Sequence, residues 1–384
     1  NTDQVQALST RQVSSFTTTQ VAAIQTDDIQ ALTTAQARSL TSAQLGALQT
    51  DQVQALETDD VAALNSLALK GLTTDGVQAL TTSQVQSLTT SQVTALTSTQ
   101  VSAIETEDIQ ALTTNQLTNL SSVQIRSLNT DQVDALTTDQ VSSLTSKQTS
   151  ALKTSQVTAI ATDDVAALTT TQIRALTSTQ VSVLGTDQVS SISTSVISNL
   201  SSISLRALNT DNIQALTSDQ VAALSTTQVM SLTTRQLASM ETDDLAALTT
   251  SQVRVLGSTQ LRALGTDQIE ALGTNQVAAL LSAQLSSLTT TQIAAMGTDQ
   301  IAALTTTQAK ALTSAQIAAL DTDQVQAITT SDVAALSSIA LRGLTTDGIQ
   351  ALTTDQVAKL TTNQLSNLSS TQVAAMETDD LAAL

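Results

Sequence analysis

Hydrophobic residues recur with a period of eight along the whole chain. Taking Asn1 as position 1 divides the 384 residues into 48 octads without insertion or deletion. Position 8 is always apolar, and position 5 is Val, Ile, Leu or Ala in every octad except the one that contains Thr149. Position 2 is always Thr or Ser, and the consensus is Thr-Thr-x-Gln-Val-x-Ala-Leu. A short, regular period of this kind indicates a repeat architecture, in which stacked neighbours bury what one unit cannot bury alone.

The junction between octads has the features of a helix start. Thr at position 1 followed by Gln at position 4 forms a capping box, and the flanking Leu and Val form a hydrophobic staple. The helix then runs to about position 8, and six residues rise only about 9 Å. Such a helix is too short to be stable alone. We therefore predict an all-α solenoid of 48 octapeptide units, with one short helix per octad. We also predict that the position-2 hydroxyl bonds the backbone at each corner.

A β-solenoid is the alternative fold. Val, Ile and Thr favour strands, and three octads make 24 residues, which is a plausible β-coil. The adjacent apolar residues at positions 7 and 8 and the capping box favour helices instead. One continuous helix is disfavoured, because eight residues turn through about 800° and the apolar stripe would drift by about 80° per octad.

A longer period of 136 residues, or 17 octads, overlies the short one. The octad pairs at 65–80, 201–216 and 337–352 resemble one another, and they carry Leu67, Ile203 and Ile339 at a normally polar position. These residues mark either a lateral contact or drift copied by duplication. We expect a single continuous solenoid over residues 1–384, as a segment of a longer array. Because 17 is divisible by neither two nor three, a solenoid with two or three octads per turn would place the copies on different sides, which favours nearly equivalent octads.

Composition removes several classes of function. The chain has no His, Cys, Pro, Trp or Tyr, and its net charge is −19. Without His or Cys, the commonest general base and the thiolate nucleophile are absent, and the periodic hydroxyls offer no distinct nucleophile, so we expect no enzyme. The negative charge disfavours nucleic acid and anionic membranes as partners. No run of 18 apolar residues occurs, so we expect no membrane insertion.

Several octads concentrate carboxylates in four residues, as in Glu-Thr-Asp-Asp. Clustered oxygen ligands suit calcium, whereas acidic residues in a first helical turn also stabilise the helix dipole. We favour the second interpretation and expect no cofactor and no metal, with calcium as the alternative. The candidate calcium ligands are Glu105, Asp108, Glu241, Asp243, Asp244, Glu377, Asp379 and Asp380.

The full octad pattern resembles the Thr/Gln/Ala/Leu octapeptide arrays of very large secreted or surface proteins of Gram-negative bacteria, which are grouped with adhesins and haemagglutinin-like proteins. The resemblance covers the whole chain and implies an extracellular or cell-surface stalk, filament or adhesive fibre. Identical units favour self-association into filaments or weak multivalent contact. A protein- or glycan-binding scaffold is the alternative function, and an ice-binding surface formed by the regular hydroxyls is a third.

Overall fold

The computed structural model describes residues 1–384 and is entirely helical. It contains 47 α-helices and one 3-10 helix, and no strands. The predicted all-α fold is therefore confirmed, and the β-solenoid is wrong. No helix has the length and hydrophobicity of a membrane-spanning segment. The internal contacts divide the chain into unit 1, Asn1–Ile192, and unit 2, Ser193–Leu384. One continuous solenoid through both units stays a prediction.

The helices of unit 1 are α1 Thr2–Gln6, α2 Thr10–Ser14, α3 Thr18–Ala22, α4 Thr26–Gln30, α5 Thr34–Ser39, α6 Ser42–Leu45, α7 Thr50–Ala55, α8 Thr58–Ala63, η1 Ala68–Gly71, α9 Thr74–Gln78, α10 Thr82–Ser87, α11 Thr90–Ala95, α12 Ser98–Ala103, α13 Thr106–Ala111, α14 Thr114–Asn119, α15 Ser122–Ser127, α16 Thr130–Asp134, α17 Thr138–Ser143, α18 Ser146–Ala151, α19 Thr154–Thr158, α20 Thr162–Ala166, α21 Thr170–Ala175, α22 Ser178–Val181 and α23 Thr186–Ser191. The helices of unit 2 are α24 Thr194–Ile197, α25 Ser202–Ala207, α26 Thr210–Gln214, α27 Ser218–Ala223, α28 Thr226–Ser231, α29 Thr234–Ala238, α30 Thr242–Ala247, α31 Thr250–Arg254, α32 Ser258–Arg262, α33 Thr266–Glu270, α34 Thr274–Ala279, α35 Ser282–Ser287, α36 Thr290–Ala294, α37 Thr298–Ala302, α38 Thr306–Ala309, α39 Ser314–Ala318, α40 Thr322–Ala327, α41 Thr330–Ala335, α42 Ser338–Leu341, α43 Thr346–Gln350, α44 Thr354–Val357, α45 Thr362–Ser366, α46 Ser370–Ala375 and α47 Thr378–Ala382.

The octad Thr89–Leu96 shows how each unit folds. The Thr89 hydroxyl accepts a hydrogen bond from the Gln92 backbone N–H at 3.3 Å, and the Gln92 side-chain Oε1 accepts one from the Thr89 N–H at 2.7 Å. This is the predicted capping box. The helix ends at Ala95, because Leu96 is extended (φ −55°, ψ 140°). The next residue, Thr97, is also extended (φ −73°, ψ 159°) and caps the following helix. Two extended residues therefore form each corner.

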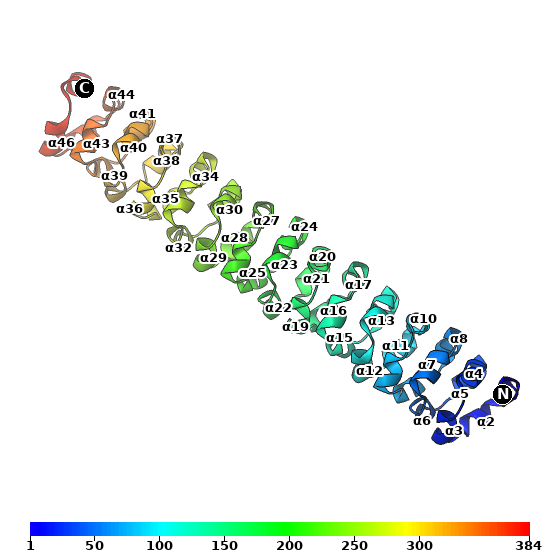
Figure 1. The fold of residues 1–384 in the computed structure, drawn as a ribbon. Helices are drawn as coiled ribbons and strands as arrows, with labels where there is room; N and C mark the ends of the chain where they lie inside the picture. The colour runs from blue at the N-terminus through cyan, green and yellow to red at the C-terminus, as the bar shows by residue number, and fades with distance from the viewer. The chain divides into compact units, whose positions relative to one another are not determined.

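Successive turns of each unit stack three octads apart. In unit 1, α11 packs against η1 on one side and α14 on the other, and the same spacing recurs in unit 2, where α27 packs against α30. Val93 and Leu96, at positions 5 and 8, are buried. Burying such a side chain contributes about 1.5–3 kcal/mol. Each unit is therefore a stack of helical turns around an apolar core (Figure 1).

The position-4 glutamine connects octads that lie four apart. The Gln92 side-chain Nε2 donates to the Val61 carbonyl at 2.7 Å and to the Leu64 carbonyl at 3.0 Å. These carbonyls belong to positions 5 and 8 of the octad four earlier. We call this arrangement the glutamine bridge: Oε1 accepts from the N–H at position 1 of its own octad, and Nε2 donates to those two carbonyls. The bridge joins the start of one helix to the end of a helix in the preceding turn.

The first turn shows what the bridge requires. Gln4, Gln12 and Gln20 form the capping box within their own octads, but no octad lies four positions before them. All three side chains are exposed, whereas Gln36 and Gln44 are about 2% exposed. Burial of the glutamine thus depends on the preceding turn.

Each turn contains more than three and fewer than four octads, because helices pack three octads apart and the glutamine bridges connect octads four apart. In Figure 1, α4, α8, α10, α13, α17 and α20 follow one another along one edge of unit 1. They belong to octads 4, 8, 11, 14, 18 and 21, since η1 occupies octad 9. Five turns therefore span 17 octads, an average of about 3.4 octads per turn. In unit 2, α27, α30, α34, α37, α41 and α44 form the equivalent edge, from octad 28 to octad 45.

This number changes the interpretation of the 136-residue period. With two or three octads per turn, 17 octads would end on a different side. At about 3.4 octads per turn, 17 octads complete five turns and return to the same side. Copies of one octad therefore face the same direction within a unit, and the octads need not be equivalent.

The structure gives the position-2 hydroxyls a different role from the predicted one. The helix-capping hydroxyl lies at position 1, as in Thr89. Position-2 hydroxyls instead bond the next turn in several octads: Ser282 Oγ donates to the Thr307 carbonyl at 3.2 Å, and Thr138 Oγ1 donates to Asp164 at 2.8 Å. These bonds do not form a regular ladder along the corners.

Replacing Gln92 by Glu should test the glutamine bridge. The change preserves the shape and the Oε1 acceptor, but it removes the donor and places a carboxylate beside two carbonyls. We expect a loss of at least about 2 kcal/mol at neutral pH, since each unsatisfied buried group costs about 1–3 kcal/mol. Hydrogen exchange of the amides in α8 and α11 measures it. The exposed neighbour Ser91→Ala is the control, and equal exchange in the two variants would contradict the bridge.

Candidate functional site

The carboxylates of the acidic octads point in two directions, into the stack and out to solvent. Asp108 and Asp244 occupy position 4, where the glutamine bridge would otherwise lie, and each is about 4% exposed. Glu105, Glu241 and Asp243, at positions 1 and 3, are exposed to solvent. Seven octads carry Asp at position 4: Asp28, Asp60, Asp108, Asp164, Asp244, Asp332 and Asp380. An ionised Asp accepts but cannot donate, so these octads lack the donor half of the bridge.

Asp60 is the least compensated of these carboxylates. Its side chain is about 3% exposed, and its Oδ2 has no hydrogen-bond partner. The pKa of Asp60 is raised to about 6, first by burial and then by the neighbouring charges of Glu57 and Asp59. A glutamine here would bridge to the octad that ends at Leu32. The ionised carboxylate therefore destabilises this turn at neutral pH.

Other buried aspartates accept a hydrogen bond from a hydroxyl of the preceding turn. Asp164 accepts from Thr138 Oγ1 at 2.8 Å, and Asp244 accepts from Ser218 Oγ at 2.8 Å. Burial raises the pKa of both carboxyls, and the hydroxyl contacts partly oppose that shift. Asp380 accepts from Thr354 Oγ1 at 3.1 Å. These pairs replace the glutamine bridge with a single hydrogen bond three octads away.

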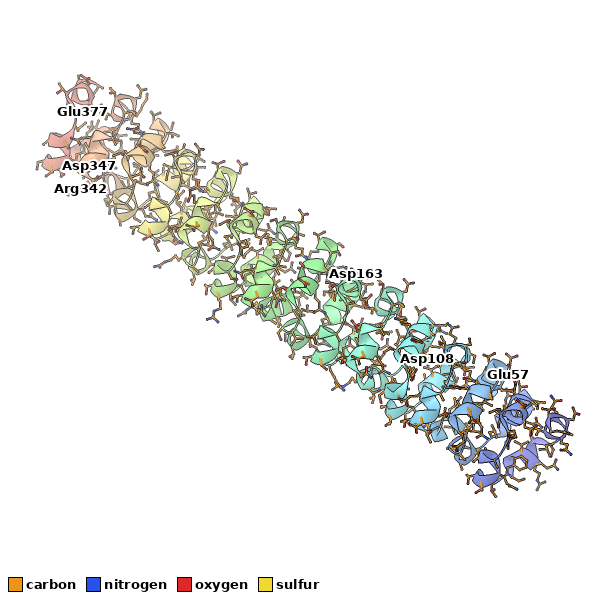
Figure 2. The ribbon with its side chains drawn as sticks, viewed as in Figure 1. Glu57, Asp108, Asp163, Arg342, Asp347 and Glu377 are labelled. Carbon is orange, nitrogen blue, oxygen red and sulfur yellow. The ribbon has the colours of Figure 1, made fainter.

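The structure does not gather the candidate calcium ligands. Asp108, Asp244 and Asp380 point into the stack, whereas Glu105, Glu241, Asp243, Glu377 and Asp379 lie on the surface. Figure 2 shows Glu377 at the edge of unit 2. No three carboxylates come together in an arrangement that could hold a metal ion. The first-turn position of these residues fits the interpretation that they stabilise the helix dipole.

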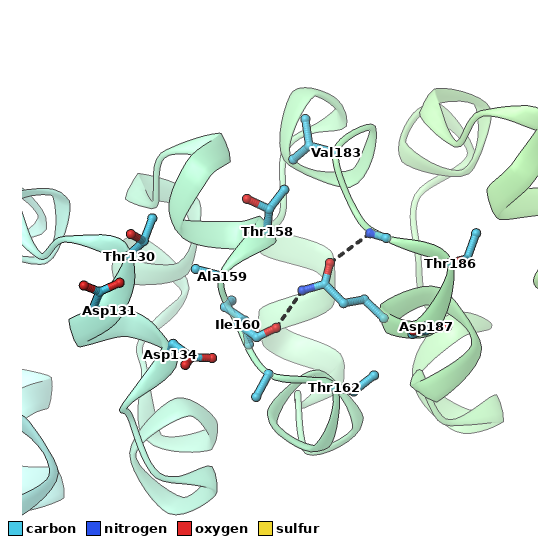
Figure 3. Close-up of a pocket in the computed structure, with 13 residues that line it drawn as sticks. Thr130, Asp131, Asp134, Thr158, Ala159, Ile160, Thr162, Val183, Thr186 and Asp187 are labelled. Atoms are coloured by element: carbon cyan, nitrogen blue, oxygen red, sulfur yellow. Dashed lines mark hydrogen bonds between the residues drawn. The ribbon is translucent and has the colours of Figure 1, made fainter. Parts of the chain in front are cut away.

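Open grooves lined by carboxylates and hydroxyls lie between turns. One of about 540 Å³ is lined by Asp131, Asp134 and Asp187 together with hydroxyls such as those of Thr130 and Thr162 (Figure 3). The Gln188 bridge lies beside it. Its Oε1 accepts from the Gly185 N–H at 2.9 Å, and its Nε2 donates to the Ile160 carbonyl at 2.7 Å.

The same groove recurs elsewhere in both units. A groove of about 370 Å³ in unit 1 is lined by Glu105, Glu107 and Asp131, and one of about 460 Å³ in unit 2 by Glu241 and Asp267. The last two grooves lie 136 residues apart in sequence. Rows of carboxylates and hydroxyls in open grooves attract cationic side chains, and they do not enclose a small ligand as a deep apolar pocket does.

The variant octads present apolar side chains to solvent. Leu67 is 69% exposed, Ile203 is 74% exposed and Ile339 is 75% exposed. Around Leu67 the α-helix is replaced by the 3-10 helix η1, and a Cβ on Gly71 would overlap the Ser42 carbonyl of the preceding turn. The tight approach of these turns explains why glycine stands at that position.

Sequence reasoning identified the acidic octads but missed what distinguishes their members. The signal was present, because Asp60 and its equivalents occupy the position that is Gln in 34 of the 48 octads. Without the number of octads per turn, however, the carbonyls that the glutamine contacts were not identifiable. The burial of these aspartates was therefore not predicted.

Comparison with known families finds one repeat family. The family model described as the ALTTAQ repeat matches residues 21–58, 53–90, 101–146, 157–194, 197–234, 237–274, 269–306, 302–330 and 325–362. These matches cover most of the chain and extend through both units. Comparison with curated proteins finds no match.

Replacing Asp60 by Gln should stabilise the protein at neutral pH. The folded-state pKa of about 6 lies above the ordinary value of 3.8. The carboxylate therefore costs no stability below pH 3.8, an increasing amount up to pH 6, and its full amount above pH 6. We expect Asp60→Gln to raise the melting temperature by several degrees at pH 7, and by less at pH 4.

Circular dichroism melts of both proteins at the two pH values measure this difference. Asp139→Asn, an exposed position-3 residue in another octad, is the control and should change the melting temperature little at either pH. A gain from Asp60→Gln that is the same at pH 4 and pH 7 would contradict the role of the buried charge.

Calcium should have no effect on the fold. Because the candidate carboxylates diverge, we expect the helical circular dichroism spectrum and the melting temperature to be the same in millimolar calcium and in excess chelator. A spectrum that changes to random coil on chelation would show instead that the acidic octads bind calcium.

Proposed function

The chain belongs to the ALTTAQ repeat family, and from this premise we propose that its function is structural: an extended repeat array that forms a stalk, filament or adhesive fibre. The observation that carries the proposal is the uniformity of the contacts. Octads throughout each unit pack three octads apart, and most also form the glutamine bridge four octads apart. A fold built this way grows by adding octads and needs no special central site.

The open grooves support the same proposal. They recur with the repeat, they are shallow and acidic, and they contain no convergent set of catalytic groups. A repeated weak site favours multivalent contact over one specific ligand. The resemblance to arrays of large bacterial surface proteins supports an extracellular or cell-surface position. The net charge of −19 favours solubility of the array.

Small-angle X-ray scattering of the full chain tests the extended form. At about 3.4 octads per turn, a continuous stack of 48 octads has roughly 14 turns, and a helix spacing of about 8–10 Å gives a length of about 130 Å. The radius of gyration of such a rod is about 38 Å, whereas a compact domain of this length has about 21 Å. We expect a value near the first number, and a value near the second would overturn the proposal.

Antibody labelling of intact cells of the source organism tests the position. Antibodies against this chain should label unpermeabilised cells or their secreted filaments. Labelling that appears only after permeabilisation would remove the extracellular part of the proposal, and it would leave the structural part in place.

A further inference from the structure

Opposite charges occupy different octads. Every octad with Lys or Arg lacks Asp and Glu, with the exception of residues 353–360, which contain Asp355 and Lys359. Because about 3.4 octads make one turn, the position of an octad in the sequence determines which side of the stack it faces. The separation along the sequence therefore becomes a separation between sides.

One side of unit 2 forms an acidic column. Its octads begin at residues 241, 265, 297, 321, 353 and 377, and five contacts connect them in order. Two of these contacts are glutamine bridges, from Gln300 to the Ile269 carbonyl at 3.0 Å and from Gln356 to the Val325 carbonyl at 3.0 Å. The others are the packing of α30 on α33, the packing of α37 on α40, and the bond from Thr354 to Asp380. The exposed carboxylates of the acidic column are those of Glu241, Asp243, Asp267, Glu270, Asp299, Asp321, Asp323, Asp355, Glu377 and Asp379, and its one exposed basic residue is Lys359.

A second set of octads forms a basic-apolar column. These octads begin at residues 201, 225, 257, 281, 313 and 337. They are connected by the packing of α25 on α28, α32 on α35 and α39 on α42, and by glutamine bridges from Gln260 and Gln316. Its exposed members are Ile203, Arg206, Met230, Arg262, Leu281, Ile339 and Arg342. The apolar members are between 44% and 75% exposed.

The two columns lie on opposite sides of unit 2. Each octad of the acidic column follows an octad of the basic-apolar column by five positions, and five octads make about one and a half turns. Figure 2 shows Arg342 and Glu377 at opposite edges of this unit. Unit 1 has the same offset: the octad of Leu67 and Lys70 precedes that of Glu105 by five positions, and the octad of Val123 and Arg126 precedes that of Asp163 by five.

We propose that copies of this chain associate side by side, with the basic-apolar column of one copy against the acidic column of the next. The proposal rests on the proposed structural function and names the surface through which the array assembles. Both columns repeat with the same sequence of three- and four-octad steps, so charges that meet at one turn meet again along the interface. A partner without this period would match only once.

The physical contributions are individually small and add along the columns. An exposed ion pair contributes about 0.2–1 kcal/mol, and burying a side chain such as Ile203 or Ile339 contributes about 1.5–3 kcal/mol. The contact joins two different surfaces, so each added copy still presents a free column of each kind. Because the two columns lie on opposite sides, this contact does not close into a small ring, and it extends into sheets or fibres.

Sedimentation velocity of the full chain tests the proposal. At about 50 mM salt we expect the wild type to associate, and at about 500 mM salt to associate more weakly, because salt screens the ion pairs but not the apolar contacts. The triple variant Arg206→Glu, Arg262→Glu, Arg342→Glu has two acidic sides and should weaken association at least about tenfold. The control Lys153→Glu, Arg235→Glu, Arg254→Glu makes the same charge change in octads that belong to neither column and should keep associating.

A mixing experiment separates column pairing from net charge. The variant Asp243→Lys, Asp267→Lys, Asp299→Lys, Asp323→Lys reverses the charge at four exposed positions of the acidic column and should associate alone at least about tenfold more weakly than the wild type. Mixed with the triple arginine variant, it should form co-assemblies at low salt. Circular dichroism confirms that each variant is folded.

Three results would overturn the proposal: a wild type that stays monomeric at low salt, a triple arginine variant that associates like the wild type, or folded partners that fail to co-assemble. A rod by X-ray scattering with no association would remove this inference alone, whereas a compact particle would remove the structural function.

Discussion

The amide of the position-4 glutamine is the interaction on which the rest of the structure depends. A helix of four to six residues leaves most of its backbone donors and acceptors without partners inside the helix. In the octad Thr89–Leu96, Gln92 satisfies a donor at the start of its own helix and two acceptors at the end of a helix one turn earlier. One side chain therefore supplies hydrogen-bond partners to unpaired backbone groups at two helix ends. The apolar residues at positions 5 and 8 supply the burial, but the amide sets which turns face each other.

The departures from this arrangement show what it constrains. Asp in place of Gln, as at Asp60, Asp164 and Asp244, preserves an acceptor and loses the donor, so the carboxylate is buried with a raised pKa or with a hydroxyl from the preceding turn. In the octads of Leu67 and Ile339, position 4 is Ala, and the turns approach closely around Gly71 and Gly343. The stack tolerates these changes because neighbouring octads keep their own bridges.

The part of this fold that could be predicted is the part encoded within one octad. The capping box of Thr89 and Gln92, the apolar positions and the helical class follow from eight residues and local physical chemistry. The number of octads per turn does not, because it depends on how helices from different turns pack. That one number determines where Gln92 donates, why Asp60 is buried and which octads share a side. The calcium candidates Asp108 and Asp244 were grouped by sequence, yet the helix places them facing inward and their neighbours outward.

The fractional number of octads per turn also bears on how such a chain changes length. Nearly identical octads invite unequal recombination, which inserts or deletes any whole number of them. At about 3.4 octads per turn, insertions of 7, 10 or 17 octads come close to two, three or five complete turns, whereas an insertion of 5 rotates everything beyond it by about half a turn. The length of the stack can therefore vary in certain increments of octads while its two sides keep the same orientation.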